Sequence, residues 1–165
     1  GWADLRRMAG HDDRDPGAED AQLGRSIGRM IHIDDLERLH FLSAILAEPE
    51  FATLKADFHS FAGGRAMAEI VVAHGGMLGM SGMVTFPKAD NVREVIAGTP
   101  RDRFLVETDT PYLAPVPYRG KPNEPSYTVE IATRLGLELG LDLDATAALT
   151  TENFFRFFSK AEVSS

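Results

Sequence analysis

The chain has 165 residues, a length typical of a single domain, of which 44% are apolar and 25% charged. This composition excludes a largely disordered or fibrous protein, and no apolar run reaches the roughly 18 residues that a membrane-spanning helix needs. Acidic residues number 25 against 17 basic ones, giving a formal charge of −8. The chain therefore lacks the strongly positive surface of a non-specific nucleic-acid binder.

The sequence contains no cysteine, which excludes disulfides, thiolate metal ligands and cysteine nucleophiles. Any metal ion must therefore be held by histidine and carboxylate side chains. No secretory signal peptide is visible after Gly1. The acidic, cysteine-free composition favours a cytoplasmic protein with no membrane partner.

Regular hydrophobic patterns begin at residue 29 and continue towards residue 165, after a polar segment, residues 1–28, that we predict to be an irregular arm. The predicted strands are residues 29–33, 56–61, 77–80 and 104–108. The predicted helices are residues 34–47, 67–74, 91–97, 125–139 and 143–160, the last with a kink or a new cap near Thr150 and Thr151. Phenylalanines at helical spacing near the carboxyl end are predicted to form a buried packing face: Phe154, Phe155, Phe157 and Phe158.

The alternation of strand and helix at intervals of 20–30 residues is typical of βαβ units, so the chain is predicted to be an α/β protein with parallel strands and outer helices. A closed eight-stranded barrel takes about 250 residues. The shorter length predicts either a partial TIM-type (β/α) barrel, spanning residues 29–165, or an open sheet with helices around it.

Metal-ligand side chains stand at the ends of three predicted strands. His32 ends the first, His59 ends the second, and Asp109 directly follows the fourth. The carboxyl ends of parallel strands meet at one edge of a sheet. Either histidine alone is more often structural, but three such residues at corresponding positions favour a site for Zn²⁺, Mn²⁺ or Mg²⁺.

Two acidic residues, Glu107 and Asp109, lie close to the end of the fourth predicted strand. On an extended backbone, residues two apart share one face, and neighbouring carboxylates need a cation, a proton or a basic side chain between them. We predict both as catalytic, with Asp109 as a metal ligand or as the base on a metal-bound water, and Glu107 orienting its neighbours. The alternative is a solvated strand end capped by Pro111.

The proline-rich loop, residues 111–125, carries the predicted substrate-binding residues Arg119, Lys121 and Asn123. Prolines reduce the entropy lost when a loop takes one shape, and the two cations can clamp phosphates. A stiff connection with no binding role is the alternative.

The residues from Phe58 to Phe158 resemble the TatD-type metal-dependent hydrolases, which are deoxyribonucleases of the amidohydrolase-like barrel class. The resemblance is carried by several motifs in order: FHSFAG at 58–63, GMSGMVTF at 79–86, LVETDTPYLAP at 105–115, RGKPNEP at 119–125 and TTENF at 150–154. More loosely, IHI at 31–33 resembles a ligand-bearing strand of the family.

This resemblance implies His32, His59 and Asp109 as ligands of a divalent metal, Mg²⁺, Mn²⁺ or Zn²⁺. It also implies hydrolysis of phosphodiester bonds by a metal-activated water, with exonuclease action on single-stranded DNA or 3′ ends.

The sequence also departs from the family pattern. It contains no His-x-His, and the only echo of the family's Gly-Glu-x-Gly-Leu-Asp segment, near Gly10, lacks the glutamate. The departures predict that the first strands of the barrel and several ligands are missing. The alternative function is therefore a catalytically silent protein with a structural or binding role. An unclosed barrel exposes strand edges, which favours a homo-oligomer.

Overall fold

The computed structural model describes residues 35–51 and 53–161. The sheet belongs to a compact unit formed by Phe41–Ser165. The predicted arm over residues 1–28 and the predicted strand over residues 29–33 lie outside the described residues, and so does His32.

Three short parallel strands form the sheet, in the order β1 (Asp57–Phe58), β2 (Met77–Met80) and β3 (Phe104–Val106). The predicted parallel α/β arrangement is confirmed. β1 and β3 are shorter than predicted because the backbone leaves the extended conformation soon after each of them. Ser60 has a φ of +49° and Asp109 a φ of +58°, values that no strand residue adopts.

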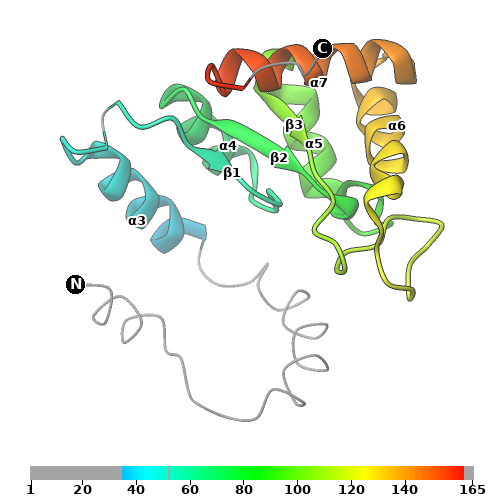
Figure 1. The fold of residues 1–165 in the computed structure, drawn as a ribbon. Helices are drawn as coiled ribbons and strands as arrows, with labels where there is room; N and C mark the ends of the chain where they lie inside the picture. The colour runs from blue at the N-terminus through cyan, green and yellow to red at the C-terminus, as the bar shows by residue number, and fades with distance from the viewer. Residues whose placement is uncertain (1–34, 52, 162–165) are drawn as a thin grey trace. The chain divides into compact units, whose positions relative to one another are not determined.

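Helices connect and surround the strands (Figure 1). α4 leads from β1 to β2, and α5 leads from β2 to β3, which are the predicted βαβ units. The α-helices are α3 (Asp35–Ala47), α4 (Arg65–Ala73), α5 (Asp90–Gly98), α6 (Thr128–Leu139) and α7 (Leu143–Phe157). Short 3₁₀ helices cover Gly82–Thr85, Arg101–Arg103 and Pro125–Tyr127. None of the described helices is both long and apolar enough to cross a membrane.

The last helix is continuous from Leu143 to Phe157, so the prediction of a new cap near Thr150 and Thr151 is wrong. α7 begins at its amino-terminal cap, Asp142, whose carboxylate accepts a hydrogen bond of 2.8 Å from the Ala145 amide. Thr150 instead donates its hydroxyl to the carbonyl of Thr146 at 3.0 Å, within the same helix. A threonine that bonds back to its own helix is compatible with an unbroken helix.

The hydrophobic core lies between the strands and the helices that follow them. β2 is buried along its whole length, as expected for the central strand of a sheet covered on both faces. α6 packs against both α7 and β3. The core comprises Val71, Leu78, Met80, Val95, Ile96, Phe104, Ile131 and Leu135, among others.

The phenylalanines of α7 are less buried than predicted. Phe154 is 41% exposed and Phe158 39% exposed, so the prediction of a buried packing face is wrong for both. They line an open groove of about 440 Å³ together with Leu105 and Val106 of β3. Periodicity alone predicted an apolar face, but whether a face is covered depends on what packs against it.

A buried asparagine, Asn153, joins α7 to the start of β3. Its side-chain amide donates to the carbonyls of Arg101 at 3.0 Å and Phe104 at 2.9 Å, and the side chain has no exposed surface.

We expect Asn153→Ala to lower the free energy of unfolding by about 1–3 kcal/mol, because buried carbonyls lose their donor. Urea denaturation measures this loss. Thr151→Ala, at an exposed position of the same helix, should change it by less than about 0.5 kcal/mol. Equal effects of the two substitutions would contradict the role of Asn153.

Candidate metal centre

The candidate site forms where two strands end. His59 directly follows β1 and Glu107 directly follows β3. The Glu107 amide donates to the carbonyl of Met80 at 3.0 Å, which continues the β2–β3 ladder to the residue that carries the carboxylate. Parallel strands end at the same edge of a sheet, so side chains distant in sequence meet there.

Left-handed backbone conformations occur at two residues of the site, Ser60 and Asp109. A non-glycine residue in this region costs on the order of 1 kcal/mol and persists only where its surroundings hold it. The amide of Ser60 donates to Glu107, and its hydroxyl pairs with that of Ser81 at 2.8 Å. The carbonyl of Asp109 accepts a hydrogen bond of 2.7 Å from the Tyr112 amide. These hydrogen bonds stabilise the left-handed conformations of Ser60 and Asp109.

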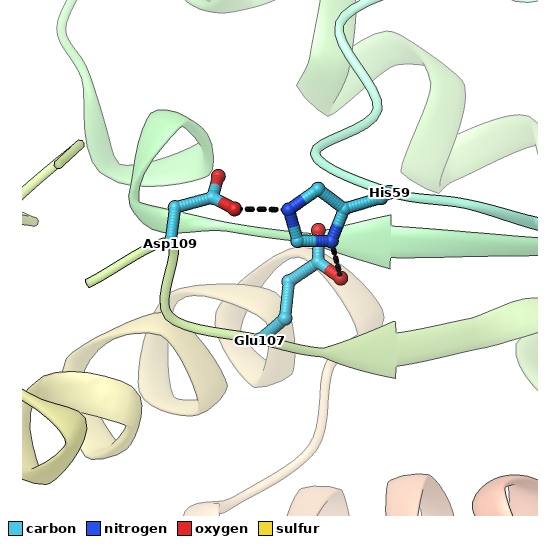
Figure 2. Close-up of side chains that lie close together, drawn as sticks. All are labelled: His59, Glu107 and Asp109. Carbon is cyan, nitrogen blue, oxygen red and sulfur yellow. Dashed lines mark hydrogen bonds and ion pairs between the residues drawn. The ribbon is translucent and has the colours of Figure 1, made fainter. Parts of the chain in front are cut away.

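The imidazole of His59 lies between two carboxylates (Figure 2). Its Nδ1 is 2.7 Å from Oε2 of Glu107, and its Nε2 contacts Oδ1 of Asp109. Ligand atoms from the three side chains all lie within 4.8 Å of one another. One nitrogen and two carboxylates at this spacing form a donor set suited to a divalent cation.

Burial and neighbouring groups shift the pKa values of His59 and Glu107. Partial burial lowers the pKa of His59, but the negative charges and hydrogen bonds of Glu107 and Asp109 outweigh it, so the net shift is upward. Burial raises the pKa of Glu107, against the opposing effects of the Ser60 amide and His59. The pKa of Asp57, at the start of the edge strand, is also raised by burial. All three shifts favour the protonated form of the group, so they reduce the negative charge of the site while no cation is bound.

One oxygen of the site has no partner among residues 35–51 and 53–161. Oδ2 of Asp109 is buried, and no described residue donates a hydrogen bond to it. A buried carboxylate oxygen without a donor is costly, and a bound cation removes that cost. The residues present therefore fit a divalent metal ion.

The two acidic residues reach His59 differently from the prediction. Glu107 and Asp109 do not share one face of an extended strand, because β3 ends at Val106 and Asp109 is left-handed. They approach opposite nitrogens of the His59 ring. The imidazole of His59 thus lies between the two carboxylates and separates them.

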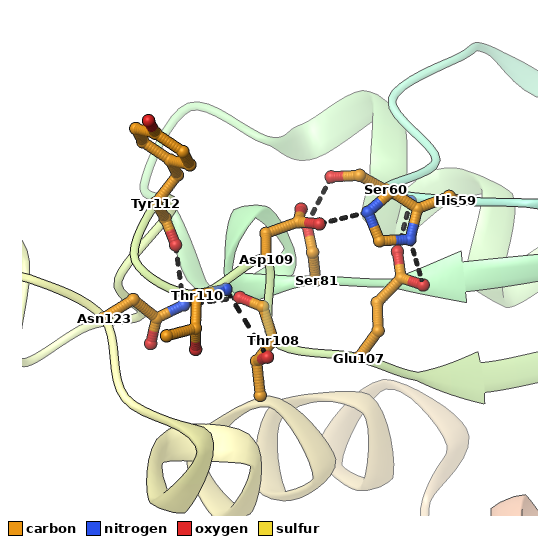
Figure 3. A network of polar contacts seen from close by, with 9 residues as sticks. All are labelled: His59, Ser60, Ser81, Glu107, Thr108, Asp109, Thr110, Tyr112 and Asn123. Carbon is orange, nitrogen blue, oxygen red and sulfur yellow. Dashed lines mark hydrogen bonds and ion pairs between the residues drawn. The ribbon is translucent and has the colours of Figure 1, made fainter.

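The proline-rich loop is tied to the site through Asn123 (Figure 3). This side chain is only 2% exposed, and its amide donates to the carbonyl of Thr108 and, at 2.7 Å, to that of Tyr112. The backbone N–H of Asn123 donates a hydrogen bond of 2.9 Å to the carbonyl of Pro111. Asn123 thus holds the turn that carries Asp109.

The two predicted basic residues of the loop, Arg119 and Lys121, are exposed. The guanidinium of Arg119 lies over the ring of Phe86, with its Cζ 3.9 Å from the ring centroid. This cation–π contact holds the charged guanidinium against the ring, while Arg119 as a whole stays exposed. The roles of Arg119, Lys121 and Asn123 in substrate binding stay predictions.

Sequence reasoning missed the residues that support the ligands. Ser60 and Ser81 lie 21 positions apart, and neither has a charge or a metal-ligand side chain. The only signal was their place inside the FHSFAG and GMSGMVTF motifs.

Comparison with known proteins places the chain in a family. The model of the TatD related DNase family matches residues 22–159, most of the sequence. The chain belongs to this family. It is 35% identical over 137 residues to the uncharacterized metal-dependent hydrolase YcfH of Escherichia coli, covering 83% of this chain and 52% of YcfH. It is also 35% identical over 114 residues to the 3′-5′ ssDNA/RNA exonuclease TatD of Erwinia amylovora, covering 66% of this chain and 44% of that protein.

The solved structure of a TatD homologue matches part of this fold. The crystal structure of YJJV, a TatD homologue from Escherichia coli, superposes with a TM-score of 0.57 and 30% identity. The match covers 61% of this chain and 39% of YJJV. The TatD-family chain spans about half the length of the curated relatives it matches. Its match to YcfH, for example, covers 52% of the YcfH sequence. Its open three-stranded sheet corresponds to part of the TatD barrel.

The contacts of Asn123 predict a local effect of its removal. Asn123→Ala should speed hydrogen exchange of the Tyr112 amide at least about tenfold, because the turn that this amide closes loses two donors. Exchange followed by NMR tests this. Asn91→Ala removes an amide that donates to Ala62 at 3.0 Å elsewhere in the fold, and should leave Tyr112 unchanged. Unaltered exchange in Asn123→Ala would show that other contacts hold the turn.

Proposed function

We propose that this chain is the metal-binding part of a TatD-type hydrolase that cleaves phosphodiester bonds of nucleic acid. His59 and Asp109 are the proposed ligands of a divalent cation, and Glu107 orients His59. His32, outside the described residues, is a further proposed ligand. The observation that carries the proposal is the direct approach of His59 Nε2 to the Asp109 carboxylate.

The orientation of His59 explains why this approach favours a cation. An ionised carboxylate only accepts hydrogen bonds, and we assign the proton of the neutral ring to Nδ1, which lies 2.7 Å from Oε2 of Glu107. In the neutral ring, Nε2 then presents a lone pair to Asp109, which also has only lone pairs to offer. Two acceptors that face each other need a proton or a metal ion between them.

The donor set limits which ion binds. One imidazole nitrogen with carboxylate oxygens suits Mg²⁺, Mn²⁺ or Zn²⁺, and the absence of cysteine excludes a thiolate site. When bound, a divalent cation neutralises phosphate charge and lowers the pKa of water. This positive charge also allows a chain of net charge −8 to approach a polyanion.

Asp109 and Glu107 have different proposed roles in the reaction. Asp109 has one oxygen directed at His59 and a second, Oδ2, without a partner among the described residues, so it can both hold the cation and accept a proton from the attacking water. Glu107 keeps the proton on Nδ1 of His59, and so fixes which ring nitrogen faces Asp109. Catalytic roles are therefore proposed for Asp109 and Glu107.

The proposed substrate is single-stranded DNA, cut from a 3′ end. The relative from Erwinia amylovora is named as a 3′-5′ ssDNA/RNA exonuclease, which supports this choice of substrate. Arg119 and Lys121 are proposed to bind phosphates. Asn123 contributes by holding the loop, because its amide donors already bond two carbonyls. The cytoplasm is the proposed location.

The second candidate is a structural or binding role without catalysis. It is supported by the exposed groove beside β3, which Phe154 and Phe158 line. Partly exposed aromatic side chains favour self-association, and so does the edge of β3 that no described strand pairs with. This candidate therefore predicts a homo-oligomer that binds no metal. Metal titration separates the two candidates.

Removal of either proposed ligand should abolish metal binding. His59→Ala and Asp109→Asn are each expected to lower Mn²⁺ affinity by more than about 100-fold, the upper end of what outer-shell changes cost, and to stop cleavage of a single-stranded oligonucleotide. Calorimetric titration measures the first effect and gel analysis the second. Asp144→Asn changes an exposed carboxylate of α7 and should alter neither. Wild-type affinity in Asp109→Asn would remove this residue from the site.

Loss of the exposed loop cation should weaken substrate binding in a salt-dependent way. Arg119→Ala is expected to reduce the slope of log K against log salt by roughly 0.7 for a single-stranded oligonucleotide, because one phosphate contact is lost. Fluorescence anisotropy at several salt concentrations measures the slope. Arg65→Ala removes an arginine that pairs with Glu69 on α4, and should leave the slope unchanged. An unaltered slope in Arg119→Ala would make the loop a structural connection.

A further inference from the structure

Gly79, in the middle of β2, lies between the two segments that carry the site. On one side, its carbonyl accepts a hydrogen bond of 2.9 Å from the Phe61 amide, two residues beyond His59. On the other side, it pairs in register with Leu105 of β3, two residues before Glu107. Gly79 is therefore in contact with both the histidine segment and the carboxylate segment.

The carboxylate of Glu107 occupies the space that a side chain at position 79 would fill. A Cβ built on Gly79 would lie 2.6 Å from Oε2 of Glu107 and 2.7 Å from Oε1 and Cδ. Real Cβ contacts are essentially never shorter than 3.0 Å. Side chains two apart on a strand point to the same face, so Glu107 extends over the face on which Gly79 has no side chain.

An added methyl group would displace the carboxylate and little else. The backbone of Glu107 is fixed by its bond to Met80 at 3.0 Å, whereas its side chain can rotate. A displaced carboxylate loses its contacts with Nδ1 of His59 and with the Ser60 amide. Alanine is at least as stable as glycine in a strand, so the fold itself should tolerate the change.

We propose that Gly79 is a positioning residue: its missing side chain leaves the space in which Glu107 reaches His59 and keeps the proton on Nδ1. Gly79 thereby determines that Nε2 is the nitrogen available to a cation. The inference rests on the proposed metal site but concerns the orientation of the histidine, which can be measured without metal.

The test compares Gly79→Ala with Gly64→Ala. Gly64 has no atom within 4 Å of a built Cβ and an ordinary negative φ, so it is a matched glycine with free space. Long-range ¹H–¹⁵N NMR of the neutral imidazole reports which ring nitrogen carries the proton. Wild type and Gly64→Ala should show His59 protonated at Nδ1, and Gly79→Ala should shift it towards Nε2. Unchanged melting temperatures would show that the fold is intact.

Metal affinity gives an independent measurement on the same variants. Gly79→Ala should lower Mn²⁺ affinity about 10–100-fold, the range for losing a partner that orients a ligand. Glu107→Gln should have a similar effect alone, and should add less than roughly twofold in the Gly79→Ala background, because both changes remove one interaction. Additive losses, or wild-type affinity in Gly79→Ala, would overturn the proposal.

The two hypotheses fail in different ways. If the wild-type chain binds no Mn²⁺, the proposed metal site is wrong, and the NMR spectra still decide the role of Gly79. If the wild type binds Mn²⁺ but the Gly79→Ala spectrum shows His59 unchanged, the metal site stands and the positioning role is wrong.

Discussion

The contact on which the site depends is the imidazole of His59 held between Glu107 and Asp109. Two carboxylates near each other repel, and a histidine between them relieves that repulsion while it gains a fixed orientation. The arrangement leaves Nε2 facing Asp109 and one Asp109 oxygen without a donor among the described residues. Both features fit the proposed metal site, in which a cation would balance the charge of the carboxylates.

The rest of the fold supports this contact through the backbone. Parallel pairing of β1, β2 and β3 brings His59 and Glu107 to one edge of the sheet, although 48 residues separate them. Ser60 and Asp109 take strained left-handed conformations, which hydrogen bonds from neighbouring segments stabilise. The precision of the site thus depends on bonds between loops that the strands alone do not set.

The open side of the sheet fits the family comparison. The chain belongs to the TatD-related DNase family but spans about half of its relatives, 52% of YcfH for example. In the described part of the chain, β3 has a partner strand only on its β2 side, and Phe154 and Phe158 of α7 line the groove beside it. A partial barrel can therefore keep a well-packed interior around β2 while it leaves aromatic surface beside β3 uncovered.

Local pattern in the sequence was enough for the type and order of the described elements, and for His59 and Asp109 as a pair at strand ends, because side-chain periodicity and turn residues act over a few positions. It did not determine where the strands stop, since the φ values of Ser60 and Asp109 are set by bonds to distant residues. Nor did it identify Ser81 or Gly79 as parts of the site. Ser81 contributes a hydroxyl that pairs with Ser60, and Gly79 contributes the space that the Glu107 carboxylate fills. Both contributions depend on how β2 packs against its neighbours, which local sequence does not specify. The exposure of Phe154 was likewise decided by tertiary structure, because burial depends on what covers a helix face and not on the face itself.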